Sequence, residues 1–208
     1  MTGKESGTDQ AMAQEDNPAS PKFWDVRFRN RRTPWDAAST PLALEQFLQS
    51  TQQRGRVLIP GCGAAYEVRS FIDSGFSVTA IDYSEAAVER AQSVLGELSS
   101  AVVYGDFFLH EYPDPVFDII YERAFLASLP RSLWRQYAER VADLLRPGGL
   151  LLGFFIHGDQ PGGPPFCLRN EELNSLLGQW FEQVENTKMH SSVPVFQGKE
   201  LWEVWRRR

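Results

Sequence analysis

Short apolar runs recur along the chain, separated by stretches in which apolar residues follow helical spacing. The runs read as buried strands cover residues 56–60, 76–82, 101–106, 117–122 and 150–157, with two more near 181–188 and 200–206. Helical patterns cover residues 39–50, 66–75, 84–98 and 132–149, with a last one near 170–180. Alternation of strands and helices predicts an α/β fold built on a parallel sheet.

The predicted fold is a doubly wound, mostly parallel sheet of seven strands, with helices on both faces and an antiparallel edge strand. Near-continuous apolar strands fit this fold because both faces of such a sheet are buried. Several residues mark helix ends. Ser84 is an N-cap candidate, Gly75 suits a helix C-terminus, and Pro147 ends the helical pattern before two glycines.

The polar residues 1–20 contain almost nothing to bury, so we expect this segment to be disordered. Residues 21–208 are expected to form a single domain. Its first part, about residues 21–40, is rich in aromatic side chains, and we call it the lid because the family resemblance described below implies that it covers the cofactor.

Composition narrows the function. The chain has 208 residues, of which 42% are hydrophobic and 23% charged, as in an ordinary soluble domain. Its net charge of −6 disfavours nucleic-acid binding. No apolar stretch is long enough for a membrane span, and no signal pattern begins the chain, so we expect a cytoplasmic protein. We expect a monomer or a weak dimer that acts on a small molecule.

Residues suited to a cofactor follow four predicted strands. Gly61, Cys62 and Gly63 form a turn after the first strand, and the second ends on Asp82, 21 residues after Gly61. That spacing suits an acid that accepts hydrogen bonds from ribose hydroxyls. Asp106 and Phe107, an acid beside an aromatic ring, follow the third strand and suit an adenine. The fourth strand ends at Glu122 and Arg123. Each feature alone also fits a tight turn or a helix cap, but ligands bind at this edge of α/β sheets.

Two residues of the glycine turn discriminate between cofactors. Tyr66 stands where a dinucleotide-binding motif places its third glycine, and Glu67 would repel a pyrophosphate at a helix N-terminus. S-adenosylmethionine (SAM) has no pyrophosphate. The turn therefore favours SAM and disfavours a nicotinamide cofactor. The two cysteines, Cys62 and Cys167, lie far apart and predict neither a disulfide framework nor a metal site.

Several stretches together resemble the thiopurine S-methyltransferase family of class I SAM-dependent methyltransferases, and its thiol/halide branch in particular. These are FWDVRFRNRRTPWD (23–36), VLIPGCGAAYEV (57–68), VTAIDYSEAAVERA (78–91), GDFF (105–108), FDIIYERAFLASLP (117–130) and PGGPPF (161–166). The resemblance implies a Rossmann-like class I fold with an N-terminal segment that lies over SAM.

The resemblance also implies roles for single residues. The implied cofactor-binding residues are Trp24, Phe28, Trp35, Gly61, Cys62, Gly63, Asp82, Asp106 and Phe107. We add Tyr83 and Glu122, which adjoin Asp82 and Arg123 in the sequence. Arg123 matches an arginine near the transfer centre, and GGPPF matches a loop that shapes the substrate pocket.

Two residues are candidates for catalysis. Arg123 could orient an anionic acceptor or lower the pKa of a thiol, and an ion pair with a nearby acid is the alternative. His157 follows a strand on the ligand side, where it suits either a proton acceptor or a structural histidine. Phe155 stands where the family resemblance predicts a hydroxylated aromatic residue, which leaves the acceptor open.

The leading hypothesis is an enzyme that moves a methyl group from SAM to a small soft nucleophile by in-line displacement. Candidate acceptors are a thiol, hydrogen sulfide, a halide, a selenium or tellurium species, or a thiopurine. One alternative is methylation of a larger natural product at oxygen, nitrogen or sulfur. Another is a SAM-binding module without catalysis.

Overall fold

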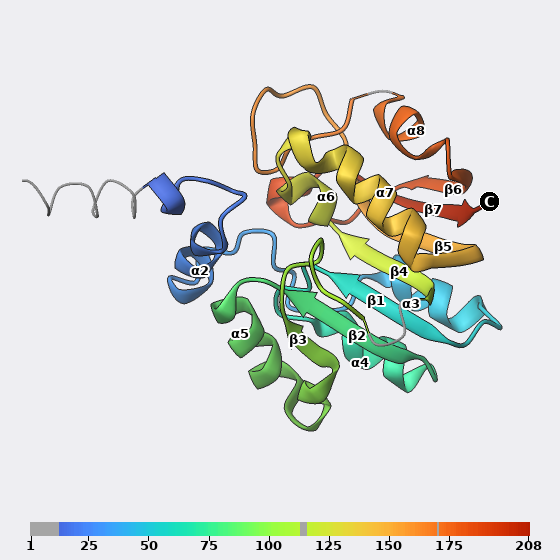
Figure 1. The fold of residues 1–208 in the computed structure, drawn as a ribbon, viewed down its shortest axis with the longest axis horizontal. Coiled ribbons are helices and arrows are strands. Elements are labelled where there is room, and N and C mark those ends of the chain that lie inside the picture. Colours follow the sequence, from blue (N-terminus) through green and yellow to red (C-terminus); the bar gives the residue numbers. More distant parts are fainter. Residues whose placement is uncertain (1–12, 113–115, 170) are drawn as a thin grey trace, which may run out of the picture.

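A computed structural model describes residues 13–112, 116–169 and 171–208. One seven-stranded sheet has the order β3-β2-β1-β4-β5-β7-β6 (Figure 1). Its strands are β1 (Arg56–Pro60), β2 (Ser77–Asp82), β3 (Val102–Tyr104), β4 (Phe117–Arg123), β5 (Leu145–Ile156), β6 (Phe181–Lys188) and β7 (Glu200–Arg207). The strands β1 to β5 pair in parallel, and β7 runs antiparallel to both of its neighbours. The predicted doubly wound sheet is confirmed.

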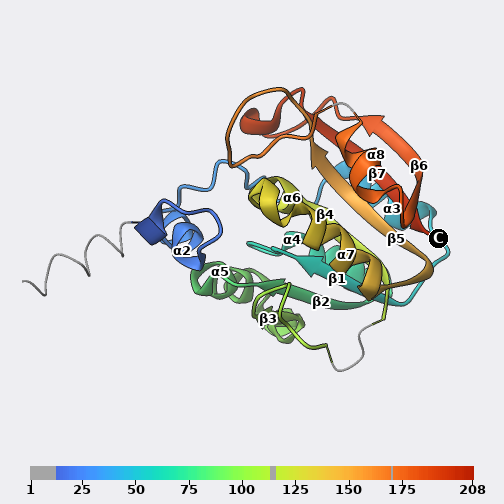
Figure 2. The same cartoon turned by 45° about the horizontal axis from the view of Figure 1, so that its top comes forward.

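Helices cover both faces of this sheet (Figures 1 and 2). The described helices are α2 (Pro21–Arg29), α3 (Leu42–Ser50), α4 (Tyr66–Asp73), α5 (Glu85–Leu95), α6 (Phe125–Ser128), α7 (Trp134–Leu144) and α8 (Glu172–Leu177). Alternate strand residues supply two hydrophobic cores: Val57 and Ile59 of β1 pack with α3, α4 and α5, whereas Leu58 packs with α6, α7 and α8. Burial on both sides explains why the central strands read as continuous apolar runs.

The main departure from the predicted elements is at residues 145–149. The helix was predicted to run up to Pro147, with a glycine turn after it, but α7 already ends at Leu144 and the chain enters β5 at once. Leu145 pairs with Phe117, and pairing resumes at Leu150 opposite Ile119, so the Arg-Pro-Gly-Gly segment forms an irregularity in the strand. Pro147 cannot continue a helix. The pairing with β7 and the continuous pairing with β4 both begin at Leu150.

The N-terminal segment is placed only in part. Of the predicted disordered segment, residues 1–12 lie outside the described residues. Ser20 donates its amide hydrogen to the Asn17 carbonyl (2.8 Å) and caps α2, a helix that the sequence did not predict. Figure 1 shows α2 beyond the carboxyl ends of β2 and β4. The described part of the chain contains no helix long and apolar enough to cross a membrane.

Candidate active site

A cavity of about 770 Å³ opens at the carboxyl edge of the sheet, beneath α2. The ends of β1, β2, β3 and β4 contribute the walls at Gly61, Asp82, Asp106 and Arg123. The volume is that of a small-molecule site. The four strand ends singled out in the sequence therefore converge on one cavity.

Asp82 is held rigidly between the glycine turn and the start of α5. Its Oδ2 accepts a hydrogen bond from the Gly63 amide at 3.0 Å, and its Oδ1 accepts one from the Ser84 amide at 2.9 Å. A carboxylate has about four acceptor sites, so lone pairs remain for a ligand. Burial raises the pKa of Asp82 to about 6. At neutral pH the side chain is therefore still an ionised acceptor.

Gly61 and Gly63 shape the turn that faces the cavity. Both adopt a positive φ, 57° and 53°, which suits glycine far better than other residues. A Cβ on Gly61 would lie 2.2 Å from a ring carbon of Phe125. The turn thus brings bare backbone to the cavity, as close approach by a ligand requires.

The lid supplies aromatic walls. Trp24 and Phe28 of α2 and Trp35 in the following segment all line the cavity. Trp35 contacts both of the others edge to face, with ring centroids 5.6 Å from Trp24 and 6.1 Å from Phe28. Such rings attract a cation placed over their faces, and a sulfonium is a cation. Tyr83, Asp106 and Phe107 line the same cavity, so these six residues, all predicted from the sequence to contact the cofactor, lie around one space.

Arg123 is the arginine at the end of β4, and only 14% of its side chain is exposed. Its Nε donates to Oε1 of the buried Glu200 at 3.0 Å. Within the described residues, the terminal nitrogens Nη1 and Nη2 of Arg123 have no hydrogen-bond partner. The ion pair with a nearby acid is therefore present, and Arg123 still has donors at the cavity wall, so its predicted role toward an acceptor stays a prediction.

The model of one protein family matches residues 19–208, and its description is thiopurine S-methyltransferase (TPMT). The chain belongs to the thiopurine S-methyltransferase family. Probable thiol methyltransferase 2 of Arabidopsis thaliana is 29% identical over 191 residues, covering 88% of this chain and 84% of the relative. Thiopurine S-methyltransferase of Pseudomonas fluorescens (strain SBW25) is 31% identical over 185 residues, covering 79% of this chain and 85% of the relative.

Solved structures agree on the fold. Burkholderia thailandensis 1,6-didemethyltoxoflavin-N1-methyltransferase, solved with S-adenosylhomocysteine, gives a TM-score of 0.73 at 18% identity, covering 100% of this chain and 92% of that one. A TehB-like SAM-dependent methyltransferase from Corynebacterium glutamicum gives a TM-score of 0.63 at 17% identity, covering 92% of this chain and 100% of that one. The class I methyltransferase fold is confirmed.

This family member is a SAM-dependent methyltransferase, as the sequence predicted. The chemistry of the cavity fits this cofactor. The ionised Asp82 can accept hydrogen bonds from the hydroxyl groups of its ribose, and the aromatic rings of the lid can attract its sulfonium. Among the described residues, no group of three or more His, Cys, Asp and Glu side chains is placed to hold a metal ion.

Three predicted site residues, His157, Glu122 and Cys62, do not line the main cavity. The ring Nε2 of His157 lies 2.7 Å from Oε1 of the buried Glu203, which also accepts from Gln183 at 2.6 Å and from Trp205 at 3.1 Å. Glu122 is fully buried and caps α6, where its Oε2 accepts from the Phe125 amide at 2.6 Å. The side chains of His157 and Glu122 are engaged in the framework that surrounds the site.

Cys62 lines a side recess of about 80 Å³ that adjoins the glycine turn. Glu67 and Tyr121 line the same recess, and the Tyr121 hydroxyl donates to Glu67 at 3.2 Å. Burial, with the nearby acids Asp82 and Glu67, raises the pKa of the Cys62 thiol well above its usual value. Since a thiolate is the reactive form, Cys62 is unsuited to be a nucleophile.

Substitution of Glu122 by glutamine should change how stability depends on pH. Burial raises the pKa of Glu122 from 4.5 to about 8, so the folded state holds a proton that the unfolded state has lost. The stability due to this group is complete below the unfolded pKa and is lost as pH rises through about 8. The loss amounts to at most about 1.4 kcal/mol per pH unit. Glu122→Gln should lose less stability between pH 6 and pH 8 in urea unfolding. Parallel pH curves for the two proteins would contradict this.

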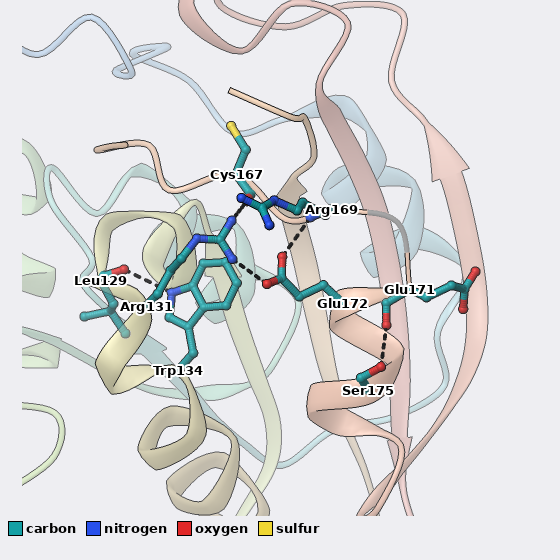
Figure 3. A network of polar contacts seen from close by, with 8 residues as sticks. All are labelled: Leu129, Arg131, Trp134, Cys167, Arg169, Glu171, Glu172 and Ser175. Carbon is teal, nitrogen blue, oxygen red and sulfur yellow. Dashed lines mark hydrogen bonds and ion pairs between the residues drawn. The ribbon is translucent and has the colours of Figure 1, made fainter. Parts of the chain in front are cut away.

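The loop of residues 161–166 reaches the cavity with Gly163, Pro164 and Pro165, as the family resemblance implied. Just beyond it, Arg131 donates to the Cys167 carbonyl and to the Glu172 side chain, and its guanidinium lies 4.4 Å from the Trp134 ring centroid (Figure 3). Glu172 also accepts from the Arg169 amide at 2.9 Å. This network anchors the end of the loop to α8 and to the start of α7.

Sequence reasoning missed several wall residues. These are chiefly Arg27, Arg32, Phe125, Leu129, Leu133, Val195 and Phe196. Val195 and Phe196 come from a short 3₁₀ turn, Pro194–Phe196, far along the chain from the strand-end motifs. No local pattern marks such residues. Arg27 lies within the lid motif, and its spacing of three from Trp24 could have placed it on the same face of a helix.

Proposed function

We propose that the cavity holds SAM against Asp82, Asp106 and the lid, and that the acceptor is a small soft nucleophile: a thiol, hydrogen sulfide, a halide or a selenium or tellurium species, thiopurines included. SAM, when bound, supplies a methyl group carried on a sulfonium. The reaction is an in-line displacement: the acceptor lone pair forms the new bond to the methyl carbon, and the electrons of the breaking bond return to the cofactor's sulfur.

The protein's part in this reaction is alignment and exclusion of water. Asp82 holds the cofactor from one side, and Trp24, Phe28 and Trp35 cover it from the other. Positioning of the two reactants is worth several powers of ten in rate without any proton transfer by the protein. We assign His157 no step, because its ring is engaged with Glu203.

One observation carries the choice of acceptor. Phe125, Leu129 and Phe196 give the cavity an apolar wall, and Arg123 adds two guanidinium nitrogens that have no hydrogen-bond partner among the described residues. An apolar wall that also carries a guanidinium group suits a soft anion, whose desolvation costs little, and the positive charge of Arg123 lowers the pKa of a thiol beside it. The names thiol methyltransferase and thiopurine S-methyltransferase among the relatives point the same way.

A matched panel of acceptors tests this proposal. Thiophenol, phenol and aniline have nearly the same shape but differ in the attacking atom, and hydrosulfide and iodide extend the panel to smaller anions. We expect kcat/KM for thiophenol to exceed that for phenol and aniline by at least about 100-fold, with S-adenosylhomocysteine formed in equal amount to product. A preference for phenol or aniline would overturn the assignment. SAM binding without turnover on the whole panel would favour a non-catalytic module.

A further inference from the structure

Asp25 lies on the lid helix α2 but points away from the cavity, to the start of α5. Figures 1 and 2 both show α2 beside that end of α5. The Asp25 Oδ1 accepts a hydrogen bond from the Ser84 hydroxyl at 2.7 Å and another from the Ala86 amide at 3.0 Å. A carboxylate at a helix N-terminus is favoured both by the free amides and by the helix dipole.

Ser84 connects this contact to the cofactor-binding acid. Its side chain is fully buried, and its own amide donates to Asp82 Oδ1 at 2.9 Å. Its hydroxyl, which donates to Asp25, also accepts from the Ala87 amide at 3.2 Å. A continuous chain of hydrogen bonds therefore runs from the lid through Ser84 to Asp82.

A second contact fixes the lid close by. The indole nitrogen of Trp24 and the hydroxyl of Tyr83 both donate to the Pro18 carbonyl, at 2.9 Å and 3.1 Å. Trp24 and Tyr83 also line the cavity. The segment 82–86 therefore contacts α2 directly through Asp25, and indirectly through the Pro18 carbonyl that Trp24 and Tyr83 share.

We infer that Asp25 is a positioning residue for the methyl transfer, one that latches α2 over the cofactor and fixes Ser84 beneath Asp82. This rests on the proposed placement of SAM in the cavity. Loss of the latch should let SAM escape faster and weaken its binding, while the bound complex still reacts.

The structure offers a matched control. Arg29 and Glu85 form a second polar contact between α2 and α5 at 3.2 Å, but their side chains are 58% and 65% exposed. Exposed ion pairs contribute little because water and salt screen them. If any contact between lid and α5 sufficed, Arg29→Gln would act like Asp25→Ala. If Asp25 is the latch, the two variants will differ.

The experiment measures KM for SAM, the SAM dissociation rate and kcat in wild type, Asp25→Ala, Asp25→Asn and Arg29→Gln. For Asp25→Ala we expect KM and the dissociation rate to rise about tenfold or more, with kcat at saturating SAM within about twofold. Asp25→Asn keeps an oxygen that can accept both hydrogen bonds, so it should stay within about threefold of wild type. Arg29→Gln should stay within about twofold.

Three results would overturn the inference. One is a fall in kcat for Asp25→Ala with KM for SAM unchanged, which indicates lost folded protein. Another is an equal effect in Arg29→Gln, and the third is an Asp25→Asn variant as weak as Asp25→Ala. The Asp82→Ala variant distinguishes failure of the Asp25 latch from failure of the proposed SAM site. If Asp82→Ala loses SAM affinity while Asp25→Ala does not, the latch fails and the site stands. If neither variant loses affinity, the placement of SAM is wrong.

Discussion

Replacement of Asp82 by alanine should weaken SAM binding by about 100-fold or more. Two ribose hydroxyls can donate to this carboxylate, and hydrogen bonds to charged groups are worth about 1.5–3 kcal/mol each. The Gly63 and Ser84 amides, which hold the carboxylate in place, would also lose their acceptor. Isothermal titration calorimetry with SAM measures the effect directly.

Two comparisons sharpen this test. Glu89→Ala removes an exposed acid from α5 and should leave the affinity unchanged, which controls for overall charge. The second comparison uses the raised pKa of Asp82, about 6. The affinity of the wild-type protein for SAM should fall as pH drops below 6, because a protonated carboxyl group is a weaker hydrogen-bond acceptor. Asp82→Asn should bind weakly at every pH, without that fall. Unchanged affinity in Asp82→Ala would refute the assignment of this residue to ribose.

Replacement of Arg123 by methionine should lower kcat/KM for a thiol acceptor by about 100-fold or more, while SAM affinity changes by less than about tenfold. The reason is that Arg123 lines the cavity and its terminal nitrogens have no hydrogen-bond partner among the described residues, so they are available to an anionic acceptor. The same change leaves Glu200 buried without its cation, which costs about 3–5 kcal/mol of stability in comparable pairs.

A double variant separates these two effects. In Arg123→Met with Glu200→Gln neither charge remains, so most of the lost stability should return. Activity should not return, because the donor is still missing. Steady-state kinetics and urea unfolding on the single and double variants measure both quantities. If the double variant regained the wild-type kcat/KM, Arg123 would be only a structural partner of Glu200.

The sheet could be predicted from the sequence because each strand is marked by a pattern of neighbouring residues. Each buried strand reads as an apolar run, and each run ends on a residue that must lie at the same edge, such as Gly61, Asp82 and Asp106. Parallel strands bring those ends together whatever the details of packing. For the same reason the position of the cavity, and the part of its wall that the strand ends form, could be predicted from the sequence.

The polar partners of the site residues could not be predicted, because they come from segments far apart in the sequence. His157 follows β5 as predicted, but its partner Glu203 lies 46 residues away, and only the β5–β7 pairing brings the two together. The Asp25–Ser84 contact spans 59 residues and follows from the docking of α2 on α5. Arg123 was expected either to hold an acceptor or to form an ion pair, and no sequence pattern named Glu200 as its partner.

The most direct test of this account is transfer of a labelled methyl group. Wild-type protein would be incubated with SAM carrying a trideuterated methyl group and with thiophenol or hydrosulfide, and the products followed by mass spectrometry. The account predicts an acceptor whose sulfur carries the intact trideuterated methyl group, with an equimolar amount of S-adenosylhomocysteine. Protein that binds SAM yet yields neither product with any soft nucleophile would contradict it.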